Sequence, residues 1–384
     1  MSDIPVISWA EAGVTKTALW RSESSVAPHQ KVVIADDKLT ADAAYRLACE
    51  GTAMLWRGDF QNARQLLQAL SRRLENKPRR AVRRAPKAPP SITEAFHLHR
   101  QSQAQRARIL GMLLVPLAGD YSVPLRRAPD VKEACVEAYG ADACQDSIVS
   151  LRELLGLIGA HEWRAKGVAV PALEQRIHPH YGVFSPVRGE YVSLVMDAPL
   201  PGLKLAFDIG TGTGVLAAVL AHRGMAHVVA TDMDARALTC ARENIARLGL
   251  TDRVEVVQAD LFPDGRASLV VCNPPWLPAR PSSRLESAVY DLDSQMLLGF
   301  LNGLALHLEP GGEGWLILSD FAEHLGLRTR EDLLAAIAAA GLVVIAKSDV
   351  APHHPKVFDA TDPLHAARSK EITSLWRLSA RPLG

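Results

Sequence analysis

The stretch from Phe207 to Gly214 reads FDIGTGTG, an apolar run that ends in an acid and three alternating glycines. Glycine has no Cβ, so it allows a sharp turn and a close approach of the backbone to a ligand. A helical pattern begins directly afterwards, at Val215. The stretch therefore predicts a buried strand that turns sharply into a helix, which is the usual ligand-binding turn of open α/β sheets.

Short apolar runs alternate with helical patterns from about residue 178 to the end of the chain. Three of the runs are HVVATD (227–232), RVEVVQAD (253–260) and SLVVCNPP (268–275). This alternation predicts an open, mainly parallel sheet with helices on both faces. The last two runs, near residues 342–350 and 371–379, have no clear helix between them. We therefore expect them to pair as an antiparallel hairpin at one sheet edge.

The first 175 residues have a different pattern. Apolar residues at helical spacing predict helices near residues 40–75, 94–115, 130–140 and 147–166. Residues 76–90, NKPRRAVRRAPKAPP, are rich in proline and basic side chains and fit no packed element. We expect a mostly helical N-terminal recognition domain over residues 1–175, with an exposed basic arm at 76–90, followed by an α/β domain over 178–384.

The composition is that of a globular protein with more than one domain. The chain has 384 residues, 48% of them apolar, and a formal net charge of +1. Its five cysteines include no C-x-x-C pair, which favours reduced thiols. The N-terminus has no apolar segment of signal length, and no run of 18 apolar residues occurs. These features predict a cytoplasmic protein without a membrane span.

Three predicted strands end in acids at one edge of the sheet. Asp208 precedes the glycine turn, and Asp232 and Asp260 close the next two runs. An acid at the end of the second strand can accept hydrogen bonds from both hydroxyls of a ribose. The glycine spacing is not G-x-G-x-x-G, and the chain contains no G-x-x-x-x-G-K-[ST] sequence. The patterns of dinucleotide-binding and P-loop proteins therefore do not apply.

The motifs DIGTGTG (208–214), ATDMD (230–234) and QADLF (258–262) resemble those of class I S-adenosylmethionine-dependent methyltransferases, over roughly residues 178–384. The resemblance implies an α/β fold with a seven-strand sheet whose last strand is antiparallel, and S-adenosyl-L-methionine as cofactor. It implies that Asp208 and the glycines line the methionine part, Asp232 holds the ribose and Asp260 holds the adenine amino group. The implied cofactor-binding residues are Asp208, Gly210, Thr211, Gly212, Gly214, Asp232, Met233, Asp260, Leu261 and Asn273.

Met233 has two interpretations. By the resemblance it would pack on the adenine face of the cofactor. Alternatively it is a buried core methionine, which is a common role for this flexible apolar side chain.

Asn273, Pro274, Pro275 and Trp276 follow the fourth predicted strand, next to the glycine turn in a doubly wound sheet. The prolines fix φ and remove two N–H donors. The Asn273 side-chain oxygen and the Pro274 carbonyl then form two acceptors for a planar NH2 group, and Trp276 offers a flat apolar wall. Such a site would promote attack on a methyl sulfonium by positioning and electrostatics.

Two further segments resemble a narrower family. [N/D]-P-P-[Y/F/W] is the signature of amino-directed methyltransferases, and residues 285–297 (LESAVYDLDSQML) resemble the E-x-x-A-[LV] block of the HemK-like release-factor glutamine methyltransferases. Residues 181–195 (YGVFSPVRGEYVSLV) resemble the segment that covers the cofactor in those enzymes and in related RNA methyltransferases. Two features depart from the pattern, because Trp276 stands where tyrosine is usual and the first 175 residues match no quoted motif.

The resemblance implies an N-methyltransferase whose leading acceptor is a glutamine side-chain amide of a protein. The alternative acceptor is guanine N2 or adenine N6 of RNA, which the basic arm favours. The non-enzymatic alternative is a cofactor-binding scaffold. The expected catalytic residues are Asn273, Pro274, Pro275 and Trp276.

The expected substrate-binding residues are Phe184, Arg188, Glu190, Trp276, His353 and Lys356. His353 and Lys356 lie in a long connection over residues 351–370, and long connections in compact domains are often functional. The histidine pairs of the chain lack cysteine or acidic companions at metal-site spacing, so we expect no metal.

Overall fold

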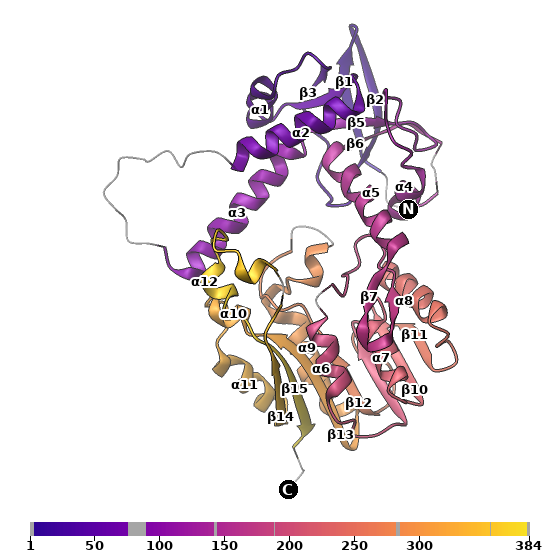
Figure 1. Cartoon of the computed structure of the whole chain (residues 1–384), viewed down its shortest axis with the longest axis vertical. Helices are drawn as coiled ribbons and strands as arrows, with labels where there is room; N and C mark the ends of the chain where they lie inside the picture. Colours follow the sequence, from indigo (N-terminus) through magenta and orange to yellow (C-terminus); the bar gives the residue numbers. More distant parts are fainter. Residues whose placement is uncertain are drawn as a thin grey trace. The chain divides into compact units, whose positions relative to one another are not determined.

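The computed structural model describes residues 4–75, 90–141, 144–187, 189–281, 285–353 and 355–381. The chain forms two compact units, and Figure 1 labels most of their helices and strands. The first unit comprises Met1–Pro89 and His97–Glu162, and the second comprises Pro90–Phe96 and Trp163–Gly384. The second unit thus includes residues 90–96 and 163–177 in addition to the segment from residue 178 onward.

The first unit is built on a six-stranded mixed sheet with the order β1-β2-β6-β5-β4-β3. Its strands are β1 (Val6–Glu11), β2 (Val14–Arg21), β3 (Val32–Ala35), β4 (Ala53–Trp56), β5 (Leu113–Leu117) and β6 (Ser147–Ser150). The helices that contribute to it are α1 (Ala41–Cys49), α2 (Phe60–Glu75), α3 (Ile92–Leu110), α4 (Lys132–Tyr139) and α5 (Leu151–Lys166).

The expectation of a mostly helical N-terminal domain is supported in part, because the sequence did not predict this six-stranded sheet beside the helices. The predicted helices are present, but β4 interrupts the one predicted over 40–75, and β6 replaces the start of the one predicted over 147–166. Both strands are four residues long and almost fully buried. An apolar run that short has no period that separates a strand from a helix.

The second unit contains a seven-stranded sheet with the order β11-β10-β9-β12-β13-β15-β14. Its strands are β9 (Leu205–Ile209), β10 (His227–Asp232), β11 (Val254–Gln258), β12 (Ala267–Cys272), β13 (Leu308–Ser319), β14 (Leu342–Val350) and β15 (Thr373–Ala380). Pairings from β11 to β13 are parallel, whereas β15 is antiparallel to both β13 and β14. The expected sheet with an antiparallel last strand and a terminal hairpin is confirmed.

The remaining elements of the second unit surround this sheet. They are a hairpin of β7 (Val168–Val170) and β8 (Gln175–Ile177), and the helices α6 (Glu190–Asp197), α7 (Val215–His222), α8 (Ala235–Arg247), α9 (Gln295–His307), α10 (Phe321–His324), α11 (Arg330–Ala339) and α12 (His365–Arg368). Short 3-10 turns lie at Pro171–Leu173, Leu285–Ala288, Leu292–Ser294 and Pro355–Phe358.

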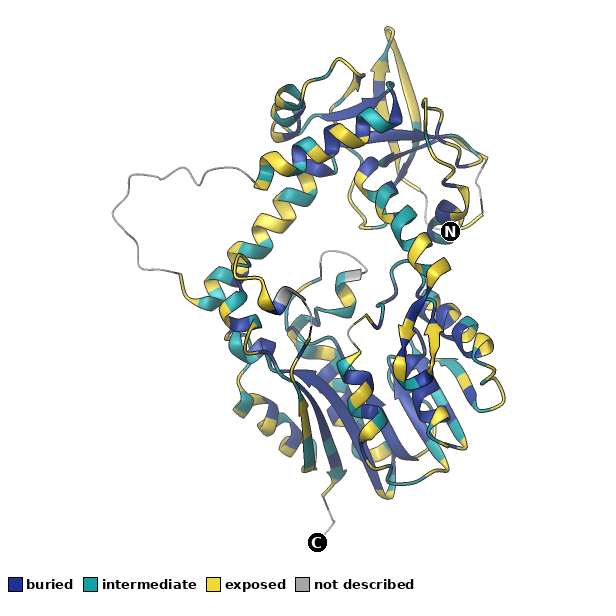
Figure 2. Ribbon diagram, viewed as in Figure 1, coloured by how far each residue is buried: buried dark blue, intermediate teal, exposed yellow. Residues whose placement is uncertain are grey.

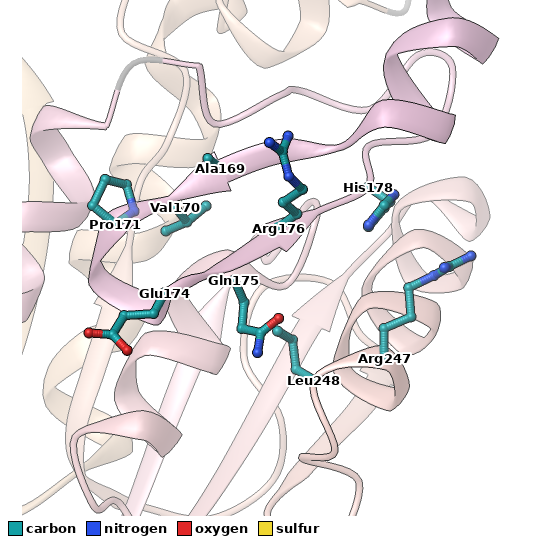
Figure 3. A pocket seen from close by; sticks show the side chains of 9 residues that line it. All are labelled: Ala169, Val170, Pro171, Glu174, Gln175, Arg176, His178, Arg247 and Leu248. Atoms are coloured by element: carbon teal, nitrogen blue, oxygen red, sulfur yellow. The ribbon is translucent and has the colours of Figure 1, made fainter.

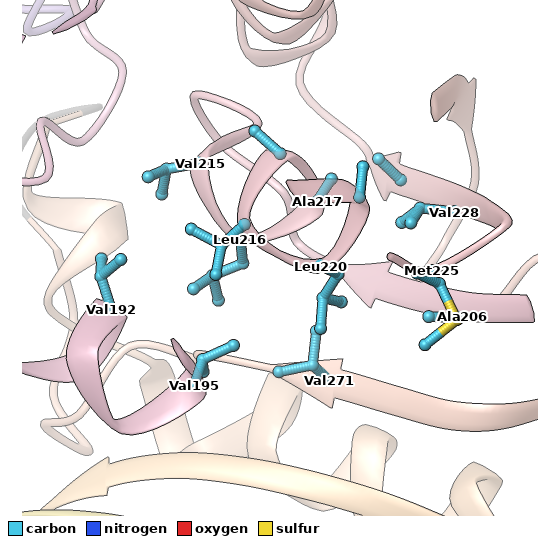
Figure 4. Packing of buried hydrophobic residues seen from close by; sticks show 14 of the residues in the cluster. Val192, Val195, Ala206, Val215, Leu216, Ala217, Leu220, Met225, Val228 and Val271 are labelled. Atoms are coloured by element: carbon cyan, nitrogen blue, oxygen red, sulfur yellow. The ribbon is translucent and has the colours of Figure 1, made fainter. Parts of the chain in front are cut away.

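Side chains of the central strands alternate between two buried clusters, one on each face of the sheet. On β12, Leu269 and Val271 join the cluster of α6 and α7, while Val270 and Cys272 join the cluster of α9 and α11. Figure 4 shows Val192 of α6 near Leu216 of α7 within the first cluster. Burial on both faces is typical of parallel strands between helix layers, and Figure 2 shows most of each central strand as buried.

The burial pattern predicts which leucines stabilise the second unit. Leu316 of β13 is fully buried, whereas Leu306 of α9 is 67% exposed. Leu316→Ala removes buried methyl groups and leaves a cavity, so the free energy of unfolding should fall by about 2–5 kcal/mol. The matched Leu306→Ala should change it by less than about 0.5 kcal/mol. Urea denaturation followed by circular dichroism measures both, and equal losses would contradict the burial pattern.

Candidate active site

The candidate site lies at the carboxyl edge of β10, β9 and β12. In the parallel register of β9 and β12, Cys272 lies opposite Ile209. The next residues are Asn273, which begins the motif Asn273–Trp276 (the acceptor motif), and Gly210, which begins the glycine turn. The two segments therefore leave adjacent strands at the same level. Ligands of open α/β sheets bind at this edge, outside the carboxyl ends of the strands.

The turn after β9 favours glycine because of its backbone shape. φ is +70° at Gly210 and +80° at Gly214, a region that side chains with a Cβ rarely adopt. A Cβ at Gly210 would meet the terminal methyl group of Met296 of α9, which would have to move aside. The Thr211 N–H donates to the Thr231 carbonyl at 2.8 Å. The turn is thus joined to β10 by a hydrogen bond and contacts α9.

Asp208 is a buried carboxylate that organises the turn. Its side chain accepts hydrogen bonds from the Thr211 hydroxyl at 2.6 Å and from the Ala217 N–H at 3.0 Å. Ala217 lies in the first turn of α7, where N–H groups have no partner within the helix. Burial raises the pKa of Asp208 from its ordinary value of 3.8 to about 6, although the two hydrogen bonds oppose the rise. Asp208 therefore links the glycine turn to the start of α7.

Asp232 ends β10 and bonds to the same turn. Its carboxylate accepts the Gly212 N–H at 3.0 Å and the Asp234 N–H at 2.9 Å. Burial raises the pKa of this carboxyl, while the backbone hydrogen bonds lower it. The predicted ribose acid and the predicted glycine turn are therefore in direct contact.

The residues predicted to hold the adenine lie on the two turns that follow β10 and β11. Met233 is 64% exposed, so the alternative of a buried core methionine is wrong. Asp260 is exposed and comes two residues after β11 ends. Leu261 has φ +67°, and its carbonyl accepts the Thr231 hydroxyl at 2.6 Å. These contacts bring the ends of β10 and β11 together.

The acceptor motif forms a compact turn after β12. Pro274 is buried, and Asn273, Pro275 and Trp276 are half-buried. The indole Nε1 of Trp276 donates to the Asn273 Oδ1 at 2.9 Å. The sequence predicted that Trp276 would stack on a substrate, but it did not predict this hydrogen bond within the motif.

Asp291 is a buried residue near the motif that the sequence did not indicate as part of the site. It is 8% exposed, and one carboxylate oxygen accepts the N–H groups of Met296 and Leu297 at 2.9 and 3.1 Å. Burial, with Asp208 and Asp291 nearby, raises the pKa of the Cys272 thiol well above its usual range. An aspartate shortly before a helical pattern is a capping signal, and this signal was present in the sequence.

The predicted substrate-side residues come together only in part. Glu190, the first residue of α6, accepts the His353 N–H at 2.9 Å, although the two are 163 positions apart. Phe184 is half-buried. Arg188 lies outside the described residues, as does the Lys356 side chain.

The chain at His178, before α6, is bound to α8 by Asn244. This residue of α8 is 1% exposed. Its side chain accepts the His178 N–H at 2.8 Å and donates to the Thr213 carbonyl at 3.0 Å. Asn244 therefore connects His178, three residues before the predicted cofactor cover at 181–195, to the glycine turn. The sequence does not indicate which groups a buried asparagine within a helix will bond to, so Asn244 was not predicted.

A hollow of about 620 Å³ lies elsewhere in the second unit. It is bounded by the β7–β8 hairpin and the last turn of α8, and Figure 3 shows the lining side chains, which include Arg176, His178 and Arg247. None of the lining residues is a predicted site residue.

Within the described ranges, no helix is long and apolar enough to cross a membrane. The same residues include no group of three or more His, Cys, Asp or Glu side chains that could hold a metal ion.

Comparisons with known proteins agree with this geometry. Residues 174–330 match the family model of the methyltransferase small domain. A release factor glutamine methyltransferase from Cereibacter sphaeroides is 32% identical over 47% of this chain and 65% of its own length. A tRNA1(Val) (adenine(37)-N6)-methyltransferase from Bacteroides thetaiotaomicron is 41% identical over 21% of this chain and 35% of its own length. Each match spans less than two thirds of the relative.

A solved structure of ribosomal protein L11 methylase from Lactobacillus delbrueckii subsp. bulgaricus is also similar. It is 19% identical, covers 54% of this chain and 86% of its own, and aligns with a TM-score of 0.36. Residues 174–330 of the second unit thus resemble a methyltransferase small domain, and the motifs in this segment implied S-adenosyl-L-methionine as cofactor.

The burial of Asp208 predicts a pH dependence of stability. Because its pKa rises from 3.8 to about 6 on folding, the folded state holds a proton that the unfolded state has lost between these values. The contribution of Asp208 to the free energy of unfolding should therefore fall as the pH rises from 4 to 6, by at most about 3 kcal/mol.

Asp208→Asn should remove this dependence. The measurement is the wild-type free energy of unfolding minus that of the variant, from urea denaturation at several pH values. The exposed Asp264→Asn serves as the control. A constant wild-type-minus-variant difference between pH 4 and 6 would show that Asp208 does not titrate in this way.

Proposed function

We propose that this chain, whose residues 174–330 resemble a methyltransferase small domain, transfers a methyl group from S-adenosyl-L-methionine to a planar amino nitrogen. The leading acceptor is a glutamine side-chain amide of a protein. The observation that carries the proposal is the register of β9 and β12, which places Asn273 beside Gly210. A methyl donor in the glycine turn would thus lie next to a group suited to hold an N–H.

The residues at the edge fit this cofactor. Asp232 is half-buried and faces the glycine turn, as a ribose-binding carboxylate requires. Met233 next to it is exposed and apolar, which suits the face of an adenine ring. The exposed Asp260 is the candidate partner of the adenine amino group. When bound, S-adenosylmethionine supplies an electrophilic methyl group on a sulfonium.

The acceptor nitrogen is bound by oxygen atoms instead of by a strong base. The Asn273 side-chain oxygen and the Pro274 carbonyl each accept one N–H of the NH2 group. Two such bonds would hold the nitrogen in place and favour its pyramidal form, with its lone pair directed at the methyl group. The N–C bond would form as the methyl–sulfur bond breaks, with S-adenosylhomocysteine as the leaving group, and the nitrogen would lose one proton to solvent. Positioning of this kind can supply much of the barrier reduction in a transfer reaction.

The choice of a glutamine amide is supported by the relatives. Three of them, 32–37% identical, are named release factor glutamine methyltransferases. The alternative, an amino group of RNA, is supported by relatives named tRNA1(Val) (adenine(37)-N6)-methyltransferases and by the basic residues of segment 76–90. In either case the first unit would serve acceptor recognition, and the Glu190–His353 contact would border the acceptor mouth.

Two substitutions separate acceptor chemistry from cofactor binding. Asn273→Ala should abolish methyl transfer while it largely preserves cofactor affinity, because it removes an acceptor-side oxygen. Asp232→Ala should instead weaken cofactor binding by about 1–3 kcal/mol, the value of hydrogen bonds to a charged group. Calorimetric titration measures the affinity of each variant, and tritium transfer measures the activity. Full activity of Asn273→Ala would exclude the proposed chemistry, and absence of wild-type cofactor binding at millimolar ligand would exclude the enzyme.

Tritiated S-adenosylmethionine identifies the acceptor class. The protein is incubated with a bacterial cell extract, and the product is treated with either RNase or protease. We expect protease to release the label and RNase to leave it in place. Release by RNase, together with steep loss of labelling as salt increases, would instead establish the RNA acceptor, because phosphate contacts release counterions.

A further inference from the structure

Trp276 makes a contact that a stacking role does not explain. Its indole Nε1–H donates to the Asn273 Oδ1 at 2.9 Å. Among the residues that the structure describes, this is the one hydrogen bond of the Asn273 side chain. We propose that Trp276 is a positioning residue, which orients the Asn273 amide so that its oxygen end binds the acceptor N–H. The inference rests on the proposed function and adds a role within the same site.

An asparagine amide has two ends of similar shape and opposite chemistry. A half-turn about χ2 exchanges the oxygen, which accepts, with the NH2 group, which donates. Indole Nε1–H is a donor only, so the oxygen end alone can satisfy it. The reversed amide would place two donors against each other. It would also direct N–H groups at the amino group of the acceptor, which is itself a donor.

The indole is the more rigid partner of this hydrogen bond. Its ring packs against both buried clusters of the sheet. Pro274 and Pro275 restrict the backbone before Trp276. After it, the Leu277 N–H donates to the Val289 carbonyl at 3.1 Å, and the Leu277 carbonyl accepts the Asp291 N–H at 2.8 Å.

The Asn273 amide has no comparable restraint. Rotation about χ2 of asparagine is broad and roughly two-fold, unlike the staggered torsions of aliphatic side chains. The amide therefore adopts the orientation that the fixed indole favours. The hydrogen bond to the fixed indole therefore restricts rotation of the Asn273 amide and holds its Oδ1 towards the amino group that is methylated.

The contact with Trp276 leaves the acceptor chemistry of Asn273 available. A carbonyl oxygen has two lone pairs, so one can take the indole N–H while the other takes an N–H of the acceptor. A phenylalanine at position 276 would have no donor, and the hydroxyl of a tyrosine would lie at a different place on the ring. Tryptophan at this position is therefore a functional departure from the tyrosine that is usual in the glutamine methyltransferases.

A double-mutant cycle tests the positioning role. Trp276→Phe should lower the initial rate of tritium transfer into a bacterial extract, at saturating cofactor, about tenfold, the effect of about one hydrogen bond. An aspartate at position 273 has two oxygens, so a half-turn of its carboxylate changes nothing. In the Asn273→Asp background, the same Trp276→Phe substitution should therefore change the rate by less than about twofold.

The matched control is Trp163→Phe, which alters a 52% exposed tryptophan and should leave the rate unchanged. In each background, the presence or absence of Trp276→Phe should change cofactor affinity by less than about twofold. Equal losses from Trp276→Phe in both backgrounds would show that Trp276 acts through packing or stacking, and would overturn the inference. If the wild type transfers no label at all, the proposed function fails.

A second measurement does not depend on activity. In ¹⁵N-labelled protein, the indole N–H resonance of Trp276, assigned by its loss in Trp276→Phe, should shift towards the position of a solvent-exposed indole in Asn273→Ala. The Trp163 resonance should not move. An unchanged Trp276 resonance would show that the hydrogen bond is absent in solution and would overturn the inference, whatever the activity of the protein.

Discussion

The parallel pairing of β9 with β12 is the constraint on which the site depends. It brings Gly210 and Asn273 to the same level of the sheet edge, and a slip of one residue would separate them by about 3.3 Å. Patterning alone does not fix this register, because both faces of β12 are apolar and a slip would exchange one apolar set for another. Polar contacts therefore add register information, as in the Ser268 hydroxyl that donates to the Leu205 carbonyl at 2.9 Å.

At the same edge, the buried carboxylate of Asp208 lowers the stability of the folded state. Asp208 is 1% exposed, and its raised pKa shows that two hydrogen bonds do not fully offset the loss of hydration. The carboxylate is retained where it caps the first turn of α7 and bonds to Thr211. Burial of Asp208 thus lowers the stability of the folded second unit, while the hydrogen bonds of the same carboxylate fix the glycine turn. Such losses of stability are common at functional sites.

The sequence reveals those parts of the structure whose signal is local. The strands of the second unit are apolar runs that end in glycine, aspartate or proline, so their order and the residues at their carboxyl edge are predictable. The sheet of the first unit is not, because strands such as β3 and β4 have four residues and merge with neighbouring helical patterns. Contacts such as that of Glu190 with His353 join segments that are far apart in the chain. Hydrophobic periodicity describes only local structure, so it does not predict such contacts.

The segment that resembles the glutamine methyltransferases lies against the glycine turn at Met296. Asp293 and Ser294 both have positive φ, a costly conformation for residues other than glycine. Asp291 stabilises the chain after them by accepting the N–H groups that begin α9. The Met296 side chain of that helix in turn abuts Gly210. The acceptor-side segment and the glycine turn therefore share a packing contact through α9. Under the proposed function, a substitution in this segment would act on both the acceptor side and the glycine turn.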